Sequence, residues 1–153
     1  FIGWNFRLSE LHAAVGIEQF KKLDGFNRIQ RRNAKILFEY LPEGIIPPHI
    51  PSYANPTLYI IGCLAREGFI REKFVEEMTR RGVNKNLPGE TVGLGYQKTL
   101  MDLPLLKPYK RQCPMAEELV RNFLWFDCHR WKSEDEMKRT AEEISDGFGA
   151  ILR

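Results

Sequence analysis

The chain has 153 residues, of which 43% are hydrophobic, 12% aromatic and 28% charged, and its formal net charge is +3. This length suits one domain with a sizeable core, and the balance of apolar and charged residues excludes wholesale disorder and fibrous repeats. No apolar run approaches the roughly 20 residues that cross a bilayer, and the first residues lack the basic-then-apolar order of a signal peptide. We therefore expect a soluble, cytoplasmic protein.

The cysteines and the basic residues exclude further classes of protein. Cys63, Cys113 and Cys128 are odd in number and have no C-x-x-C pair, which argues against a disulfide framework and a zinc site. Cys128 and His129 are adjacent, so on a strand they would point to opposite faces, and a metal site or a thiol enzyme built on them is a remote alternative. The densest basic run, formed by Arg28, Arg31 and Arg32, is expected to be a solvated helix face rather than a nucleic-acid surface.

Two helical patterns open the chain. Ser9 is a good N-cap, and Glu10 puts a negative charge in the first turn, where the helix dipole favours it. The first helix has a broad apolar surface, which is interpreted either as tight core packing or as a subunit or domain interface; its members are Leu11, Ala14, Val15, Ile17, Phe20 and Leu23. Gly25 interrupts this pattern, and a second amphipathic helix is expected over residues 27–41. Five prolines between positions 42 and 56 then favour an extended connector.

The remainder of the chain alternates strands and helices. Residues 57–65 are predicted to form a buried strand and residues 70–81 a helix ending at Gly82, with a second strand beginning at Val83. Residues 86–112 show no sustained period, and a loop of that length is more often functional than idle. A short helix over 115–122, a third strand over 123–126 and a final helix opened by the capping box of Ser133 and Glu136 complete the series. The pattern predicts an α/β (α+β) fold with a small three-stranded sheet covered by helices.

Local motifs do not identify an active site. No G-x-G-x-x-G follows a strand, and the sequence contains no H-E-x-x-H, P-loop or G-x-S-x-G. The three histidines are scattered. On these grounds alone the chain is a globular domain of unassigned function.

A longer motif at the beginning of the chain does indicate a protein family. Residues 3–24 read GWNFRLSELHAAVGIEQFKKLD, and this stretch resembles, without a gap, a signature of the DegT/DnrJ/EryC1/StrS aminotransferases, which use pyridoxal phosphate (PLP). The later order fits as well, with Arg31 and Arg32 in the second helix and Cys113-Pro114-Met115-Ala116-Glu117 before the third strand. The resemblance covers essentially the whole chain and corresponds to the C-terminal part of the family.

The resemblance implies a fold and a domain organisation. The chain is expected to be the C-terminal small domain of a fold type I PLP-dependent transferase, preceded by long helices. Residues 1–41 would be linking helices with a motif for cofactor and dimer contacts, and residues 42–153 would be the small domain itself. The complete protein would be a homodimer that binds neither nucleic acid nor a membrane.

The resemblance also implies roles for single residues. Asn5 matches the asparagine that reaches the PLP phosphate held by the neighbouring subunit, and an amide can donate hydrogen bonds to phosphate oxygens. Arg7, Lys85 and Asn86 are candidates for contacts to substrate, since a guanidinium pairs well with a phosphate or carboxylate. The segment 89–101 departs from the histidine-bearing versions expected in the family.

The implied reaction transfers an amino group from glutamate or glutamine to a keto-sugar, in nucleotide-linked form, for amino-sugar, cell-surface polysaccharide or antibiotic biosynthesis. The Schiff-base lysine of the family belongs to the large domain, and none of the lysines here has a matching context, so no catalytic residue is assigned and this chain alone is expected to be inactive. The alternative is a non-catalytic interaction or regulatory module derived from the same domain.

Overall fold

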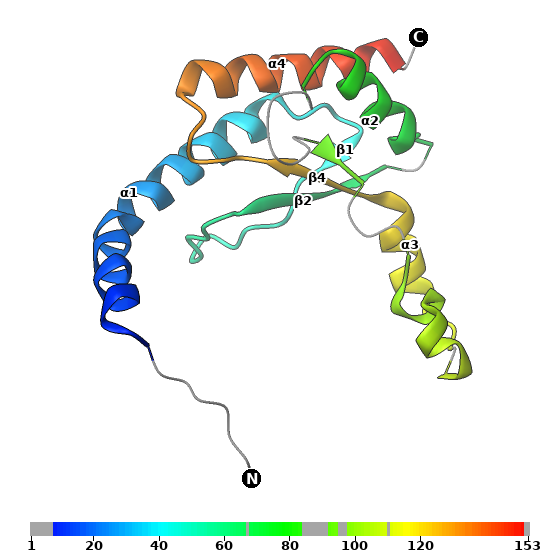
Figure 1. The fold of residues 1–153 in the computed structure, drawn as a ribbon. Helices are drawn as coiled ribbons and strands as arrows, with labels where there is room; N and C mark the ends of the chain where they lie inside the picture. The colour runs from blue at the N-terminus through cyan, green and yellow to red at the C-terminus, as the bar shows by residue number, and fades with distance from the viewer. Residues whose placement is uncertain (1–7, 67, 84–91, 95–97, 110, 152–153) are drawn as a thin grey trace.

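The computed structural model describes residues 8–66, 68–83, 92–94, 98–109 and 111–151 of the chain (Figure 1). Helices and strands mix along the chain as the sequence predicts. The elements are α1 (Glu10–Tyr40), β1 (Ile45–Ile46), β2 (Ile60–Ala65), α2 (Arg71–Arg80), β3 (Val92–Gly93), the 3₁₀ helices η1 (Leu100–Asp102) and η2 (Pro104–Tyr109), α3 (Pro114–Asn122), β4 (Phe123–Asp127) and α4 (Glu134–Ile151).

The described strands form one antiparallel sheet with the order β1-β2-β4-β3. The expected number of three strands is wrong, because two short strands add to the edges. β1 lies in the proline-rich stretch that was expected to be a plain connector, and it pairs with the end of β2. The strand expected at Val83 is also wrong, since residues 81–83 form a turn and Val92–Gly93 pairs with β4 instead.

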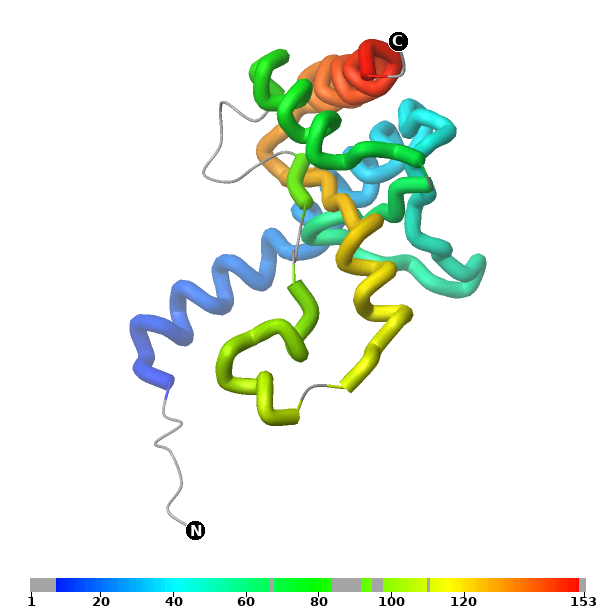
Figure 2. Tube along the Cα trace, turned by 90° about the vertical axis from the view of Figure 1, so that its right-hand side faces the viewer, coloured from blue at the N-terminus to red at the C-terminus, as the bar shows by residue number. Residues whose placement is uncertain are grey.

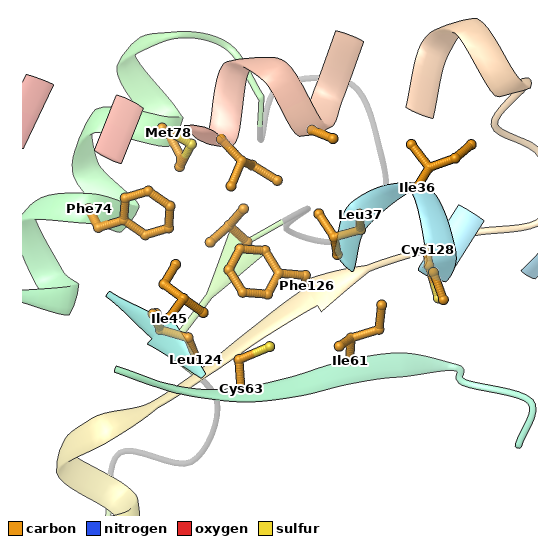
Figure 3. Packing of buried hydrophobic residues seen from close by; sticks show 14 of the residues in the cluster. Ile36, Leu37, Ile45, Ile61, Cys63, Phe74, Met78, Leu124, Phe126 and Cys128 are labelled. Atoms are coloured by element: carbon orange, nitrogen blue, oxygen red, sulfur yellow. The ribbon is translucent and has the colours of Figure 1, made fainter. Parts of the chain in front are cut away.

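The hydrophobic core lies between one face of the sheet and the helices α1, α2 and α4 (Figures 1 and 3). Alternate residues of β2 and β4 point into it, and the buried members of the two strands are Ile61, Cys63, Ala65, Leu124 and Phe126. Phe126 is fully buried and meets Phe74 of α2 edge-on, with 6.4 Å between the ring centroids. Only the second half of α1 takes part, beginning at Asn33.

The first long helix differs from its prediction in one respect. Ser9 caps it as expected, and its side chain accepts a hydrogen bond from the His12 backbone amide. The helix then runs without a break to Tyr40, so the expected separation into two helices at Gly25 is wrong. A glycine inside a helix costs about 1 kcal/mol relative to alanine, which weakens a helix without ending it. Of the described glycines, Gly68 and Gly82 have a positive φ, and Gly82 ends α2 as predicted.

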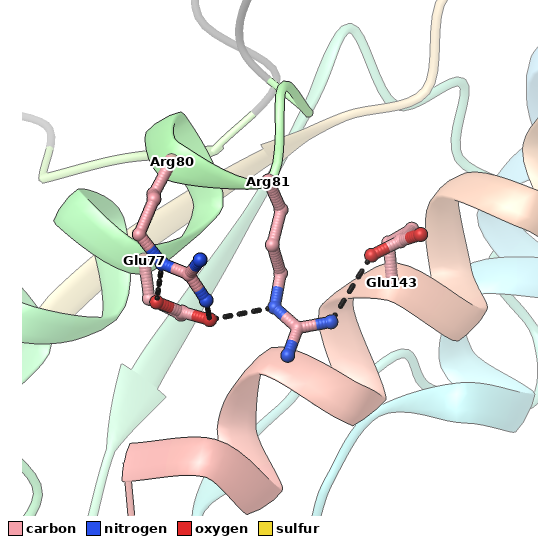
Figure 4. Close-up of polar contacts among 4 residues, drawn as sticks. All are labelled: Glu77, Arg80, Arg81 and Glu143. Atoms are coloured by element: carbon pink, nitrogen blue, oxygen red, sulfur yellow. Dashed lines mark hydrogen bonds and ion pairs between the residues drawn. The ribbon is translucent and has the colours of Figure 1, made fainter.

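The two surface helices α2 and α4 are joined by a group of charged side chains (Figure 4). Glu77 accepts hydrogen bonds from the guanidinium groups of both Arg80 and Arg81, at 2.6–2.7 Å. Arg81 also donates to Glu143 of α4 at 3.2 Å. These contacts lower the pKa of Glu77 from 4.5 to about 2, mainly through the hydrogen bonds from Arg80 and Arg81.

Among the described helices, none is both long and apolar enough to cross a membrane.

The lowered pKa of Glu77 predicts an acid-dependent part of the stability. Because the folded state favours the ionised carboxylate, its contribution is present above the unfolded pKa of about 4.5 and is lost as the pH falls towards 2. We expect Glu77→Gln to flatten the loss of thermal stability over that pH range. Melting temperatures measured between pH 6 and pH 2 test this, with Glu76→Gln, an exposed neighbour on the same helix, as the control. Equal pH slopes for the two variants would contradict the prediction.

Candidate functional site

The four residues that the family resemblance assigns to cofactor or substrate lie outside the described residues. They are Asn5 and Arg7, before α1, and Lys85 and Asn86, before β3. The structure therefore brings none of them together in its described part. What it does describe is the helix that directly follows the first motif, since Asn5 precedes the cap of α1 by four residues.

The first half of α1 presents large apolar side chains to solvent. Leu11 is 82% exposed and Phe20 is 74% exposed, with Leu8, Val15, Ile17 and Leu23 also exposed. In both views this half of the helix projects away from the sheet (Figures 1 and 2). Core packing within this chain therefore does not explain the apolar surface of the helix. The other interpretation, a subunit or domain interface, remains. A helix that is apolar around most of its circumference is normally covered by protein on more than one side.

The basic run on the same helix is not a solvated face. Arg31 and Arg32 are half-buried and donate hydrogen bonds to backbone carbonyl groups, at 3.1–3.3 Å, of the segments before β2 and after β4. Arg28 is exposed, as expected. The expectation of a solvated basic face is thus wrong for two of its three members. Sequence spacing could not reveal this, because the carbonyl partners lie about 25 and 100 residues away.

A buried carboxylate lies at the end of β4. Asp127 is 1% exposed, and its Oδ1 accepts a hydrogen bond from the His129 backbone amide and lies 2.9 Å from the Nδ1 of that side chain. Its Oδ2 is buried and has no hydrogen-bond partner among the described residues. Burial raises the pKa of Asp127, and burial also lowers the pKa of the nearby Lys132. Sequence reasoning missed this group, since an acidic residue that ends a strand normally lies at the surface.

The adjacent cysteine does not have the chemistry of a nucleophile. Cys128 is fully buried, its Sγ lies 3.0 Å from the Leu58 carbonyl, and burial raises the pKa of the thiol to about 12. A nucleophilic cysteine needs a lowered pKa and access to substrate. The ring of His129, which follows β4, has its Nδ1 2.9 Å from the Oδ1 of Asp127 and is tilted against the ring of Trp131, with 4.3 Å between the centroids. The thiol-enzyme alternative therefore loses its support.

Thiol titration tests this assignment. Cys63 and Cys128 are buried with pKa values of about 12, whereas Cys113 is partly exposed at the start of α3. At pH 8 we expect one thiol to react rapidly with an aromatic disulfide reagent and the other two to react only on unfolding. Cys113→Ser should remove the rapid phase. A fast phase that survived this substitution would place an accessible thiol at one of the two core positions.

Two surface hollows adjoin the sheet and its helices. One, of about 620 Å³, lies between β2 and α3 and includes the exposed guanidinium groups of Arg66 and Arg121 together with Phe69. The other, of about 390 Å³, lies between α2 and α4 and includes Lys73, beside Glu76 and Glu77. The first has a basic rim with one acidic residue, Glu118, whereas in the second the positive charges of Lys73 and Arg80 are balanced by Glu76 and Glu77.

Comparison with known proteins identifies the family. A sequence model of the DegT/DnrJ/EryC1/StrS aminotransferase family matches residues 1–145. The chain belongs to this family. Among proteins of curated function, a sequence comparison found no match.

Solved structures of sugar aminotransferases share the fold. PseC of Helicobacter pylori, an aminotransferase involved in the biosynthesis of pseudoaminic acid, matches with a TM-score of 0.80 at 18% identity, over 98% of this chain and 40% of that one. The sugar aminotransferase CalS13 of Micromonospora echinospora matches with a TM-score of 0.77 at 17% identity, over 95% of this chain and 37% of that one. The chain thus spans about 40% of the length of these structures.

The same fold also occurs in an enzyme with a different reaction. The GDP-4-keto-6-deoxy-D-mannose-3-dehydratase of E. coli, solved with bound hydrated PLP, matches with a TM-score of 0.70 at 21% identity, over 94% of this chain and 37% of that one. At such identities the likeness establishes the fold, whereas the family match establishes membership among the aminotransferases.

Proposed function

We propose that this chain is the C-terminal part of a PLP-dependent aminotransferase that transfers an amino group from glutamate or glutamine to a nucleotide-linked keto-sugar. The observation that carries the proposal is the family match over residues 1–145, which includes the GWNFRLSEL motif at the start of α1. Structural neighbours described as sugar aminotransferases support the substrate class. The product would serve amino-sugar, cell-surface polysaccharide or antibiotic biosynthesis.

The exposed half of α1 supports a larger assembly. Its apolar side chains, with Leu11 and Phe20 largely exposed, would be costly to leave in water, at roughly 25 cal/mol per Å² of apolar surface. In the complete homodimer this half would pack against the large domain and the second subunit. We assign residues 1–41 to this linking and contact role and residues 42–153 to the small domain.

The described residues do not by themselves fit PLP. Lys73 lines a hollow with Arg80, Glu76 and Glu77, so two negative charges balance its two positive charges and Arg80 is already paired with Glu77, which leaves no net attraction for a phosphate. Lys132 is half-buried, but it lies close to the buried Asp127 rather than in a hollow with phosphate donors. We therefore infer that the cofactor lysine belongs to the large domain, and that this chain alone does not catalyse amine transfer.

Within the complete enzyme we assign one cofactor contact to this chain. The amide of Asn5 would donate a hydrogen bond to the PLP phosphate held by the neighbouring subunit, which adds a donor without adding charge. Arg7, Lys85 and Asn86 would contact the substrate, with the Arg7 guanidinium suited to a phosphate or carboxylate oxygen.

The test uses the complete protein, expressed with its large domain. We expect bound PLP, seen in the absorbance spectrum, and conversion of more than one equivalent of glutamate per site to 2-oxoglutarate only when a nucleotide-linked keto-sugar is present to take up the amine. Asn5→Ala should raise the Kd for PLP about tenfold, as for one lost hydrogen bond to an anionic group, while Asn27→Ala on α1 should leave it unchanged. A complete protein without PLP and without amine transfer would overturn the proposal in favour of a non-catalytic module. Loss of a hydroxyl group from the sugar without transfer of an amino group to it would indicate a dehydratase.

A further inference from the structure

Among the described residues, the long helix α1 packs against the rest of the domain along its second half. Residues 8–24 project from the sheet, and from Asn33 onward the helix packs in the core. At the beginning of the packed part, the side chains of three consecutive residues, Arg31, Arg32 and Asn33, make hydrogen bonds to two segments far away in the sequence.

Arg31 holds one side of the helix. Its guanidinium donates to the carbonyl groups of Asn55 and Pro56, at 3.2 and 3.3 Å, and to the Thr57 hydroxyl at 3.3 Å. These three acceptors belong to the connector that leads into β2. The contact therefore ties the middle of α1 to the beginning of the central strand.

Asn33 and Arg32 hold the helix from a second direction. Asn33 is completely buried, and its amide donates to the carbonyl groups of His129 and Lys132, at 2.8 and 3.3 Å. Arg32 donates to the Asn33 side-chain oxygen at 2.9 and 3.1 Å and to the Lys132 carbonyl at 3.1 Å. Both side chains thus bind the loop of residues 129–132, which joins β4 to α4. The loop in turn is fixed by the Asp127 carboxylate, which accepts the His129 backbone N–H.

The same loop contacts α1 again two turns earlier. The Arg130 guanidinium lies over the ring of Phe26, 4.3 Å from its centroid. Phe26 and Asn33 are seven residues apart, so they share one face of the helix. Two contacts separated by two helical turns fix the direction of the helix axis, in addition to the core packing of Ala34, Ile36 and Leu37.

We propose that Arg31, Arg32 and Asn33, with the Arg130 contact to Phe26, form a clamp that fixes the direction in which the first half of α1 leaves the domain. At 1.5 Å per residue, Glu10 lies about 35 Å along the helix from Asn33, so a tilt of about 5° there moves the helix tip by about 3 Å. On the proposed function, Asn33 is then a positioning residue for Asn5, since it sets where the motif before α1 meets the cofactor.

The direct test measures the direction of the helix. Nitroxide labels on Ala14→Cys of α1 and Glu142→Cys of α4, both exposed positions, report the distance between the two helices in a Cys113→Ser background. Labelled chain is diluted with unlabelled chain so that pulsed electron spin resonance detects distances within one molecule. The remaining cysteines, Cys63 and Cys128, are buried.

Asn33→Leu keeps the branched shape and the number of heavy atoms of the side chain but removes its amide donors and the oxygen that accepts from Arg32. We expect it to broaden the distance distribution, or to shift its maximum, by about 2.5 Å or more, which corresponds to a tilt of about 5° over the roughly 28 Å between Asn33 and Ala14. Asn27→Leu, the same change at a half-buried position of the same helix, should leave the distribution unchanged. Should Asn33→Leu fail to fold, Arg130→Ala replaces it, because this exposed residue covers Phe26 without being part of the core.

A second measurement separates the clamp from the proposed function. In the complete enzyme, Asn33→Leu should raise the Kd for PLP about tenfold, as Asn5→Ala does, while the melting temperature of the chain reports any general loss of stability. Unchanged distances in Asn33→Leu and Arg130→Ala would overturn the clamp. Altered distances with PLP binding unaffected by Asn33→Leu but weakened by Asn5→Ala would overturn the positioning role. If Asn5→Ala also had no effect, the proposed cofactor contact would fail, and the clamp would stand on the distances alone.

Discussion

Replacing Phe126 by alanine is expected to lower the free energy of unfolding by about 3–5 kcal/mol, the usual cost of removing a buried aromatic side chain. Phe126 is fully buried between β4 and the helices, with Phe74 and Leu37 on neighbouring elements of the same core (Figure 3). The alanine variant leaves a cavity that the rigid sheet cannot close. Since natural domains have only about 5–15 kcal/mol of stability, this loss is a large part of the total.

Urea denaturation of the chain measures this difference. Tyr53→Ala is the control, because the ring of Tyr53 is 90% exposed and its removal should change the free energy of unfolding by less than about 0.5 kcal/mol. Phe126→Leu, which refills most of the volume, should cost less than about 1.5 kcal/mol. Similar values for Phe126→Ala and Tyr53→Ala would mean that the core is not packed around this residue.

Replacing Arg71 by methionine is expected to cost about 2–3 kcal/mol, although arginine is normally a surface residue. The Arg71 side chain is 9% exposed and donates to the carbonyl groups of Val120 and Phe123, at the C-terminal end of α3, the second at 3.1 Å. Its Nε also donates to Glu72 at 2.9 Å. A cation that binds the last carbonyls of a helix satisfies groups that have no partner within the helix and interacts favourably with its dipole.

Methionine preserves the apolar stem of the side chain but leaves these carbonyls without their donor. Thermal and urea unfolding compare Arg71→Met with Arg28→Met, in which an exposed arginine of α1 is changed in the same way with little expected effect. Lysine at position 71 should restore part of the stability, because it supplies charge without the planar pair of donors. The prediction fails if Arg71→Met is as stable as Arg28→Met.

The elements with strong local signals are those that the sequence predicts best. The Ser9 cap, the positive φ of Gly82 and the reciprocal hydrogen bonds of Ser133 and Glu136 all follow from contacts within four residues. The final helix is also as predicted, with Met137, Ala141 and Ile144 buried at intervals of four and three. Such features depend on nearest neighbours along the chain, which a sequence displays directly.

The elements that were predicted wrongly depend on distant partners. β1 and β3 have two residues each, too few to show an alternating pattern, and they exist because the edges of β2 and β4 offer unpaired backbone groups. Ile70 was expected to be the first residue of the helix over 70–81, but it is the N-cap of α2 and is 48% exposed, and the neighbouring Arg71 is buried. The helix predicted to break at Gly25 continues, and the packing of Phe26 under Arg130 illustrates the tertiary contacts that support it.

The candidate site also combines features that the sequence predicts with features that depend on distant partners. The motif over residues 3–24 identifies the family from sequence alone, because its polar and apolar identities at fixed spacing go beyond what amphipathicity requires. The sequence does not predict the contacts of Arg31 and Asn33. Arg31 was expected to be part of a solvated helix face, and Asn33 gave no signal. Their roles follow from carbonyl groups that only the fold brings within hydrogen-bond distance.

The sequence by itself thus determined the family, the class of fold and the helices with caps and clear periodicity. The tertiary structure decided the number of strands, the continuity of α1, the burial of Asp127 and the residues that hold α1 against the sheet. The physical reason is the range of the interactions. Caps and helical periods arise between residues a few positions apart, whereas edge strands and buried polar groups are stable only where the folded chain supplies their hydrogen-bond partners.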